Sequence, residues 1–117
     1  MLFRSGSSDD RLTQMLALQT RGKVHARRGD HAEAQRLARE AVAIGDQNDL
    51  LNYVGDAYAD LAEVLVLADE PAQAVDALTR AVQHYSEKGN LVSRDRALDR
   101  LAELAPHLPG GSAISPT

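Results

Sequence analysis

The sequence contains no cysteine and no tryptophan, and Phe3 is its only phenylalanine. The absence of cysteine excludes disulfide bonds and thiolate chemistry, which fits a reducing cytoplasm. The scarcity of aromatic residues argues against a β-sandwich, whose strands favour aromatic and β-branched side chains. No apolar run approaches the roughly 20 residues that a membrane-spanning helix needs, and the first ten residues lack the apolar core of a secretory signal. We therefore expect a cytoplasmic protein with no membrane partner.

A strong charge of either sign is also missing. The chain has 13 Lys and Arg residues against 17 Asp and Glu residues, a formal net charge of −4, which gives no case for a nucleic-acid surface. The charge is nevertheless uneven, because residues 1–40 sum to +3 (eight basic, five acidic) and residues 41–117 to −7 (five basic, twelve acidic). Either solvated helix faces happen to differ in charge, or the protein packs head to tail against another copy or a neighbouring repeat.

The chain does contain an internal repeat with a spacing of forty residues. The segment 22–42 resembles the segment 62–82, and apolar or small side chains recur at matching positions. These pairs are Val24 and Val64, Ala32 and Ala72, Ala34 and Ala74, Leu37 and Ala77, Ala38 and Leu78, Ala41 and Ala81, and Val42 and Val82. A fixed period of this length is typical of stacked supersecondary units that cannot bury their apolar faces alone.

Apolar residues at three- and four-residue spacing predict helices. We expect two antiparallel helical hairpins, at about 10–46 and 50–88, and a closing helix at about 91–105 that covers the second hairpin. The predicted fold is therefore all-α, with about five helices stacked as an α-solenoid within residues 9–105. A chain of 117 residues suits such a single domain.

Residues between the helices carry start and stop signals. Gly29 can adopt the left-handed conformation that closes a helix, and Asp69 occupies the same place one repeat later. Asp30 and Glu33 form a capping-box pattern at the start of the second helix. Asn90 is a good N-cap residue for the closing helix.

The two ends of the chain differ from the repeats. Residues 1–5 look like the translation of a sequencing-adapter scar joined to a truncated reading frame. We therefore expect residues 1–8 to be disordered or artefactual, and the chain to be the tail of a longer protein. Pro106 and the run Pro109–Ser112 end the last helix, so we expect residues 106–117 to form a flexible tail.

The small residues in these hairpins resemble the consensus of the tetratricopeptide repeat (TPR), in which two antiparallel helices approach closely at small side chains. The second unit matches its run of aromatic, Leu, small, Ala, large apolar and Ala through Tyr58, Leu61, Ala62, Ala74, Leu78 and Ala81. The first unit retains the small positions at Gly22, Ala34 and Ala41, but it departs from the consensus at Arg21, His25 and Ala38. The spacing is forty residues rather than about thirty-four, and we expect the surplus to lengthen the junction around Ile44–Leu51.

Residues 10–105 further resemble the C-terminal helical tail of large bacterial signalling proteins. Those proteins combine a nucleotide cyclase or a DNA-binding output with an NTPase module and a TPR tail. The resemblance implies a regulatory or scaffolding segment whose active centres lie upstream. No catalytic or cofactor-binding residue is carried over, because the matching motifs are absent from this chain.

Motifs for chemistry do not occur. None of the four histidines, His25, His31, His84 and His107, belongs to a metal-binding spacing such as H-E-x-x-H. The chain has no phosphate-binding loop and no serine-nucleophile elbow. We therefore expect no enzyme activity, no cofactor and no metal.

TPR grooves imply a partner-binding face on the inner wall formed by the first helix of each hairpin. The candidate residues on this wall are Gln19, Lys23, Arg27, Asp56 and Glu63. The Lys and Asn pattern that holds a terminal carboxylate is missing, so a C-terminal peptide is disfavoured. The wall either binds a protein or peptide, or packs only against upstream repeats or domains of the same parent chain.

These observations predict a non-catalytic protein–protein interaction and scaffolding segment, forming the C-terminal part of a bacterial signal-transduction or transcription regulator. One alternative is a purely structural helical-repeat fragment with no ligand of its own. Another is a DNA-linked regulatory module that uses the basic residues between Arg21 and Arg28. Nucleic acid is disfavoured, because those side chains do not share one helix face and no aromatic residues lie between them.

Overall fold

The computed structural model describes residues 8–108, and every regular element within that range is helical. The elements are α1 (Ser8–Arg27), α2 (His31–Gln47), α3 (Leu51–Leu67), α4 (Pro71–Lys88), α5 (Leu91–Leu104) and a short 3-10 helix, η1 (Ala105–His107). The prediction of an all-α chain with about five helices is confirmed. The expectations for residues 1–7 and 109–117 lie outside the described residues.

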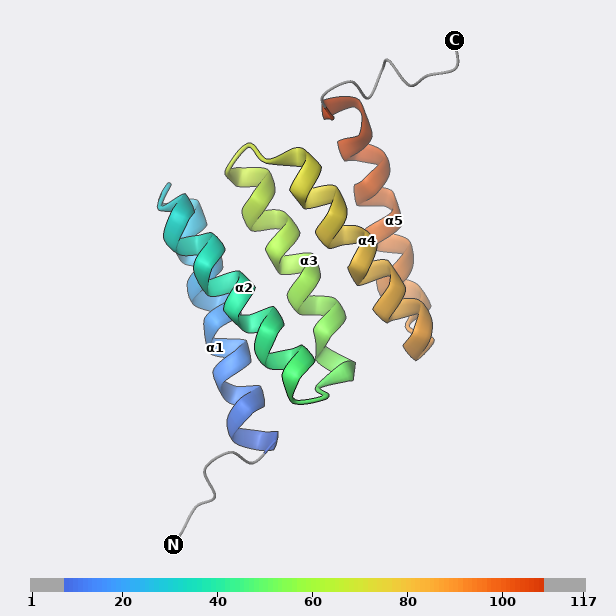
Figure 1. Ribbon diagram of the computed structural model, residues 1–117. Coiled ribbons are helices and arrows are strands. Elements are labelled where there is room, and N and C mark those ends of the chain that lie inside the picture. The colour runs from blue at the N-terminus through green and yellow to red at the C-terminus, as the bar shows by residue number, and fades with distance from the viewer. Residues whose placement is uncertain (1–7, 109–117) are drawn as a thin grey trace, which may run out of the picture.

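Successive helices run antiparallel and pack as stacked hairpins, α1 with α2 and α3 with α4 (Figure 1). Helix α2 also contacts α3, and α5 contacts α4, so the helices stack in chain order. The odd-numbered helices form one layer, in which α1 lies behind α2 and α5 lies behind α4 in Figure 1. The core lies between the layers, and its largest fully buried side chains are Met15, Leu37, Val54, Val64 and Leu65.

Small residues permit the close approach of paired helices, as the sequence predicts. A Cβ atom added to Gly22 would lie 3.3 Å from the carbonyl oxygen of Ala34 and 3.5 Å from the amide nitrogen of Ala38. One repeat later, Ala62 and Ala74 are both completely buried. Larger side chains at these positions would separate the two helices of a hairpin.

The four corners share one geometry and recur every twenty residues. Gly29, Asp49, Asp69 and Gly89 all have a positive φ, of 86°, 55°, 62° and 73°. In each corner the following residue donates its backbone N–H to the carbonyl five residues earlier, over 2.8 to 3.0 Å. Helices α2 to α5 accordingly begin at residues 31, 51, 71 and 91. The predicted left-handed conformations at Gly29 and Asp69 are confirmed.

Two local predictions are wrong. The junction between α2 and α3 is not lengthened, because it comprises only residues 48–50 and the extra residues of the repeat lie within the helices. The side chain of Asp30 makes no capping hydrogen bond at the start of α2. It lies instead 3.2 Å from Nδ1 of His25, across the corner. The cap at Asn90 is confirmed, because its side chain accepts a hydrogen bond from the amide of Ser93.

Candidate functional site

Two of the residues predicted to bind a partner, Gln19 and Lys23, contact the neighbouring hairpin. The amide Nε2 of Gln19 donates to Oδ2 of Asp60 on α3 over 2.8 Å, and Nζ of Lys23 lies 3.4 Å from the same oxygen. Gln19 is only 7% exposed. Both side chains therefore join α1 to α3, and Gln19 offers little surface to a ligand.

The predicted wall residues on α3 also have internal partners. Glu63 accepts two hydrogen bonds from the guanidinium group of Arg100 on α5, of 2.9 and 3.0 Å. The hydrogen bond from Arg100 to Glu63 is the main reason why the pKa of Arg100 is raised. Asp56 accepts a hydrogen bond of 2.5 Å from the hydroxyl of Tyr85 on α4. Burial is the main cause, and this bond the second, of the raised pKa of Tyr85.

The five predicted residues do not converge on one site. Asp56 and Glu63 line a small groove of about 360 Å³ between α3 and α5, whereas Gln19, Lys23 and Arg27 do not contribute to it. Arg27 is exposed at the end of α1 and makes no side-chain ion pair within the described residues. The wall thus consists largely of polar contacts that link the odd-numbered helices.

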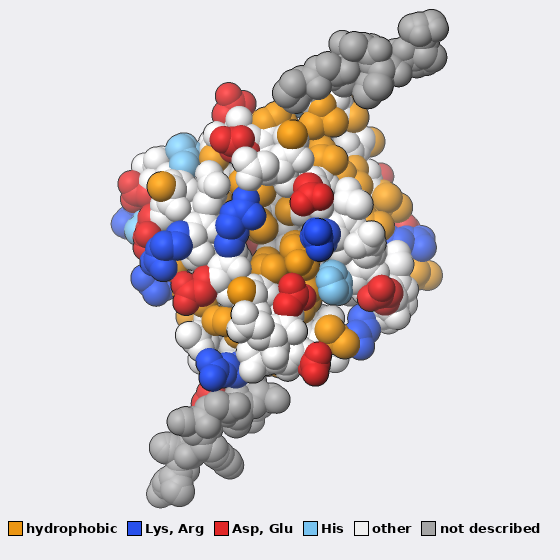
Figure 2. All heavy atoms as spheres, viewed as in Figure 1, with side chains coloured by type: hydrophobic (Ala, Val, Ile, Leu, Met, Phe, Trp, Pro, Cys, Tyr) orange, Lys and Arg blue, Asp and Glu red, His pale blue; other side chains and the backbone are white. Residues whose placement is uncertain are grey.

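A larger groove lies on the opposite layer, between α2 and α4, with α3 at its base. We call it the α2–α4 groove. Its volume is about 650 Å³, and it is lined by Arg39, Val42, Ala43, Asp46, Tyr58, Leu61, Leu65, Ala72, Gln73, Asp76, Ala77 and Arg80. Figure 2 shows the hollow, with hydrophobic side chains at its base and charged side chains around its edge. The base consists of buried residues of the core, whereas the charged residues are exposed.

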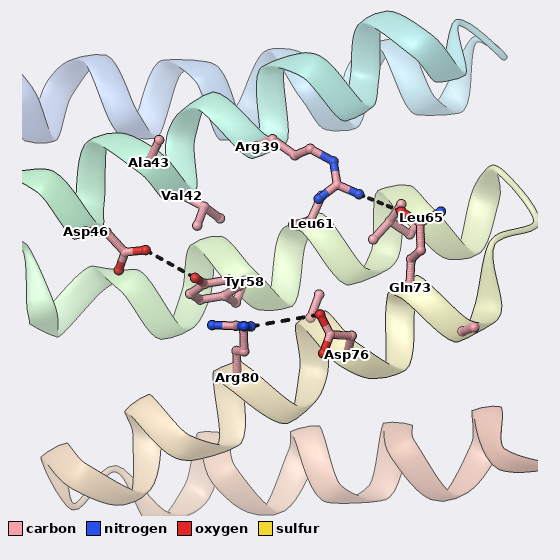
Figure 3. Close-up of a pocket in the computed structure, with 12 residues that line it drawn as sticks. Arg39, Val42, Ala43, Asp46, Tyr58, Leu61, Leu65, Gln73, Asp76 and Arg80 are labelled. Atoms are coloured by element: carbon pink, nitrogen blue, oxygen red, sulfur yellow. Dashed lines mark hydrogen bonds and ion pairs between the residues drawn. The ribbon is translucent and has the colours of Figure 1, made fainter.

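The aromatic ring of Tyr58 forms one end of the base (Figure 3). Its hydroxyl donates to Oδ2 of Asp46 over 3.1 Å. The ring of His84 stacks on it with centroids 5.5 Å apart, and the guanidinium carbon of Arg80 lies 6.0 Å from its centroid. Burial, followed by the charge of Asp46, raises the pKa of Tyr58. These contacts hold the ring in a fixed orientation.

Two arginines approach the groove from opposite helices. Arg39 on α2 donates to the amide oxygen of Gln73 over 2.7 Å, a neutral partner that leaves its charge uncompensated. Arg80 on α4 lies 3.9 Å from Asp76, a long contact between two exposed groups. An exposed pair at this distance attracts weakly. The edge of the groove therefore offers the charge of Arg39 beside an apolar base, while Asp46 and Asp76 lie on the same edge.

The sequence did not reveal this groove, because its three helices are assembled only by tertiary packing. The internal repeat already contained Val42, and the TPR consensus contained Tyr58 and Leu61, but neither pattern indicates which of its residues remain accessible. One signal was available, namely the small residues Ala43, Ala72 and Ala77 on the facing sides of α2 and α4. Small side chains between two helices leave space above the residues beneath them.

Within residues 8–108, no group of three or more His, Cys, Asp or Glu residues could hold a metal ion. In this part of the chain, no helix has both the length and the apolar character needed to cross a bilayer.

The fold and its grooves define an all-α protein of stacked helical hairpins. Comparison with known proteins adds no narrower assignment, because no family model, curated protein or solved structure matches the chain significantly.

Proposed function

We propose that this chain is a non-catalytic protein–protein interaction and scaffolding segment of the TPR type, and that it binds a segment of a partner protein in the α2–α4 groove. The observation that carries the proposal is this open groove, with a base of buried apolar side chains. Its volume of about 650 Å³ lies within the usual range of binding pockets. A groove between two helices of 17 and 18 residues also suits a peptide or a helix laid along it.

The chemistry of the groove specifies the partner segment. Apolar side chains of the partner would cover Leu61, Leu65 and Tyr58 at the base. An acidic side chain would lie near Arg39, whose own partner Gln73 is uncharged. A charge-assisted hydrogen bond of this kind is about twice as strong as a neutral one. We therefore expect a segment in which apolar residues stand beside Asp or Glu.

We further propose that the segment belongs to the C-terminal part of a bacterial signal-transduction or transcription regulator in the cytoplasm. The support is the resemblance of residues 10–105 to the helical tails of such proteins. Upstream domains of the same parent chain are then possible sources of the partner segment, as are separate proteins.

A purely structural fragment that packs on upstream repeats is less well supported. In the second hairpin, Val54, Ala57 and Leu61 of α3 are buried. The residues forty positions earlier on α1 are Gln14, Ala17 and Arg21, and all three are exposed. These three positions of α1 therefore offer a preceding hairpin less apolar surface than their counterparts on α3 would.

Duplex binding by the basic residues near the end of α1 has even less support. Lys23 lies within ion-pair distance of Asp60, and the remaining cations are dispersed around the helix. A DNA-linked module would bind duplex strongly at low salt and lose affinity steeply as salt rises. Absence of duplex binding at low salt would remove this alternative.

The groove can be tested by filling it. Peptides are first selected from a phage-displayed random library on the full chain, and their affinities are then measured by fluorescence anisotropy. Ala43→Trp places a large ring in the groove, whereas Ala32→Trp is a matched change at an exposed position of α2 outside it. We expect selected peptides to contain adjacent apolar and acidic residues, and Ala43→Trp to weaken them about tenfold or more, a cost of about 1.4 kcal/mol. Failure to enrich peptides, or equal binding to both variants, would overturn the proposal.

A further inference from the structure

The outer surface of α5 is more apolar than a solvated helix requires. Leu91, Val92 and Leu98 are 51%, 66% and 45% exposed, and α5 buries only Ala97 and Leu104. The residues forty positions before Leu98 and Ala102 are Tyr58 and Ala62, which are buried in the second hairpin. Helix α5 thus displays the packing face of an odd-numbered helix, and no second helix covers it within the described residues.

This surface has a regular pattern that we call the outer α5 face. It consists of exposed residues at positions i, i+4, i+7 and i+11, namely Leu91, Asp95, Leu98 and Ala102. Asp99 lies beside it and is also exposed. Asp95 forms an ion pair of 3.0 Å with the adjacent Arg94, whereas Asp99 has no side-chain partner within residues 8–108. The face is therefore apolar with an acidic edge.

A face with the same spacing and the opposite charge occurs at the other end of the molecule. The outer α1 face consists of exposed residues at i, i+4 and i+7, namely Ala17, Arg21 and Val24, and the exposed Arg28 follows in the corner just after the helix. Neither arginine forms a side-chain ion pair within the described residues. When the two faces are aligned by spacing, Arg21 matches Asp95 and Val24 matches Leu98. Residues at these intervals lie on one side of a helix, so two faces with equal spacing can place their matching residues opposite each other.

We infer that copies of this chain associate head to tail, with the outer α5 face of one copy packed against the outer α1 face of the next. Helices α1 and α5 lie at opposite ends of the stack, so one molecule cannot join its own two faces (Figure 1). The charge of +3 in residues 1–40 and −7 in residues 41–117 favours the same orientation. Contacts between two different faces do not close on themselves unless a rotation makes a ring, so the association continues beyond a dimer.

The association can be measured on the full chain by analytical ultracentrifugation. We expect the average mass to rise past that of a dimer with increasing concentration, and to fall when the salt is raised from about 0.05 M to about 0.5 M, because salt screens exposed charges. A monomer at every concentration would overturn the inference. A closed dimer that ignores salt would also overturn it, because such a dimer would indicate α5 pairing with α5.

Charge reversal gives a sharper test. The variants Arg21→Glu/Arg28→Glu and Asp95→Arg/Asp99→Arg should each remain monomeric alone, because each carries two faces of like charge. An equimolar mixture of the two should associate again, because every contact then joins opposite charges. The control Arg36→Glu/Lys88→Glu has the same change in charge as the first variant but lies on α2 and α4, outside the α2–α4 groove, and it should associate as the original chain does. Circular dichroism checks that each variant is folded. A mixture that stays monomeric, or a control that dissociates, would overturn the inference.

Discussion

Both hairpins pair a large residue with a glycine at one pair of facing positions, but the large residue lies on the first helix in one hairpin and on the second helix in the other. In the first hairpin Met15 of α1 packs against Gly45 of α2, where an added Cβ would lie 2.8 Å from the Met15 methyl carbon. Forty residues later the large and small partners change places, because Gly55 of α3 packs against Tyr85 of α4, with a Cβ distance of 2.7 Å. The repeat thus conserves the combined volume of a pair of facing positions, and either helix can carry the large side chain.

The largest effect is expected from Gly55→Met, which gives the second hairpin the large residue of the first while Tyr85 stays in place. Because the new Cβ overlaps the tyrosine ring, the free energy of unfolding should fall by about 3 kcal/mol. Urea denaturation measures this loss. The double variant Gly55→Met/Tyr85→Gly should lose less free energy of unfolding than the two single variants lose together, by about 1 kcal/mol or more. Strict additivity would show that the two positions do not share one volume.

A second test concerns the small residues that the hairpins have in common. Ala74 is completely buried, and Ala74→Leu should lower the free energy of unfolding by about 2 kcal/mol through overpacking. The control Ala72→Leu lies on the same helix at an exposed position and should change stability by less than about 0.5 kcal/mol. An unchanged midpoint for Ala74→Leu would contradict the close approach of α3 and α4.

Tyr85, which stands where the first hairpin has Gly45, predicts that the stability of the protein depends on pH. Burial is the main reason why the folded-state pKa of Tyr85 is raised. The contribution of Tyr85 to the free energy of unfolding is therefore complete below its unfolded-state pKa of about 10. That contribution is lost as the pH rises from there toward the folded-state pKa. We expect Tyr85→Phe to cost about 1 kcal/mol at pH 7 through the lost bond to Asp56. Between about pH 9 and pH 11 the original chain should lose more stability than this variant. Parallel losses in urea titrations would disprove the assignment.

The smallest effect is expected at the corners. Asp69 adopts the same positive φ as Gly29, at which glycine is less strained. Asp69→Gly should therefore be neutral or up to about 1 kcal/mol more stable, whereas Gly29→Asp should be neutral or less stable by a similar amount. Thermal and urea unfolding compare both variants. A loss above about 1 kcal/mol for Asp69→Gly would show that its side chain has a role of its own.

Much of the fold was predictable because it depends on local patterns. Spacings of three and four residues predicted five helices, and Gly29 and Asp69 predicted two of the corners. The predicted cap at Asp30 failed because a competing partner, His25, lies within 3.2 Å across the corner. The predicted junction around Ile44–Leu51 failed because both neighbouring helices continue almost to each other.

The candidate site was less predictable, because its properties arise between helices that are distant in sequence. The sequence placed Lys23 and Glu63 on one wall, but it could not show that Asp60 and Arg100 contact them. The α2–α4 groove likewise depends on how far apart two helices lie above α3. Periodicity predicts which side of a helix is buried, and it does not predict the space left above that side.

The uniform corners have a consequence for engineering longer molecules. Since the corners at residues 29, 49, 69 and 89 all have a positive φ and helices α2 to α5 begin twenty residues apart, duplicating residues 51–90 after Asn90 would add one complete hairpin without disturbing its neighbours. Each inserted unit would create another trough between successive even-numbered helices. The valency of such a rod would then increase in proportion to its length.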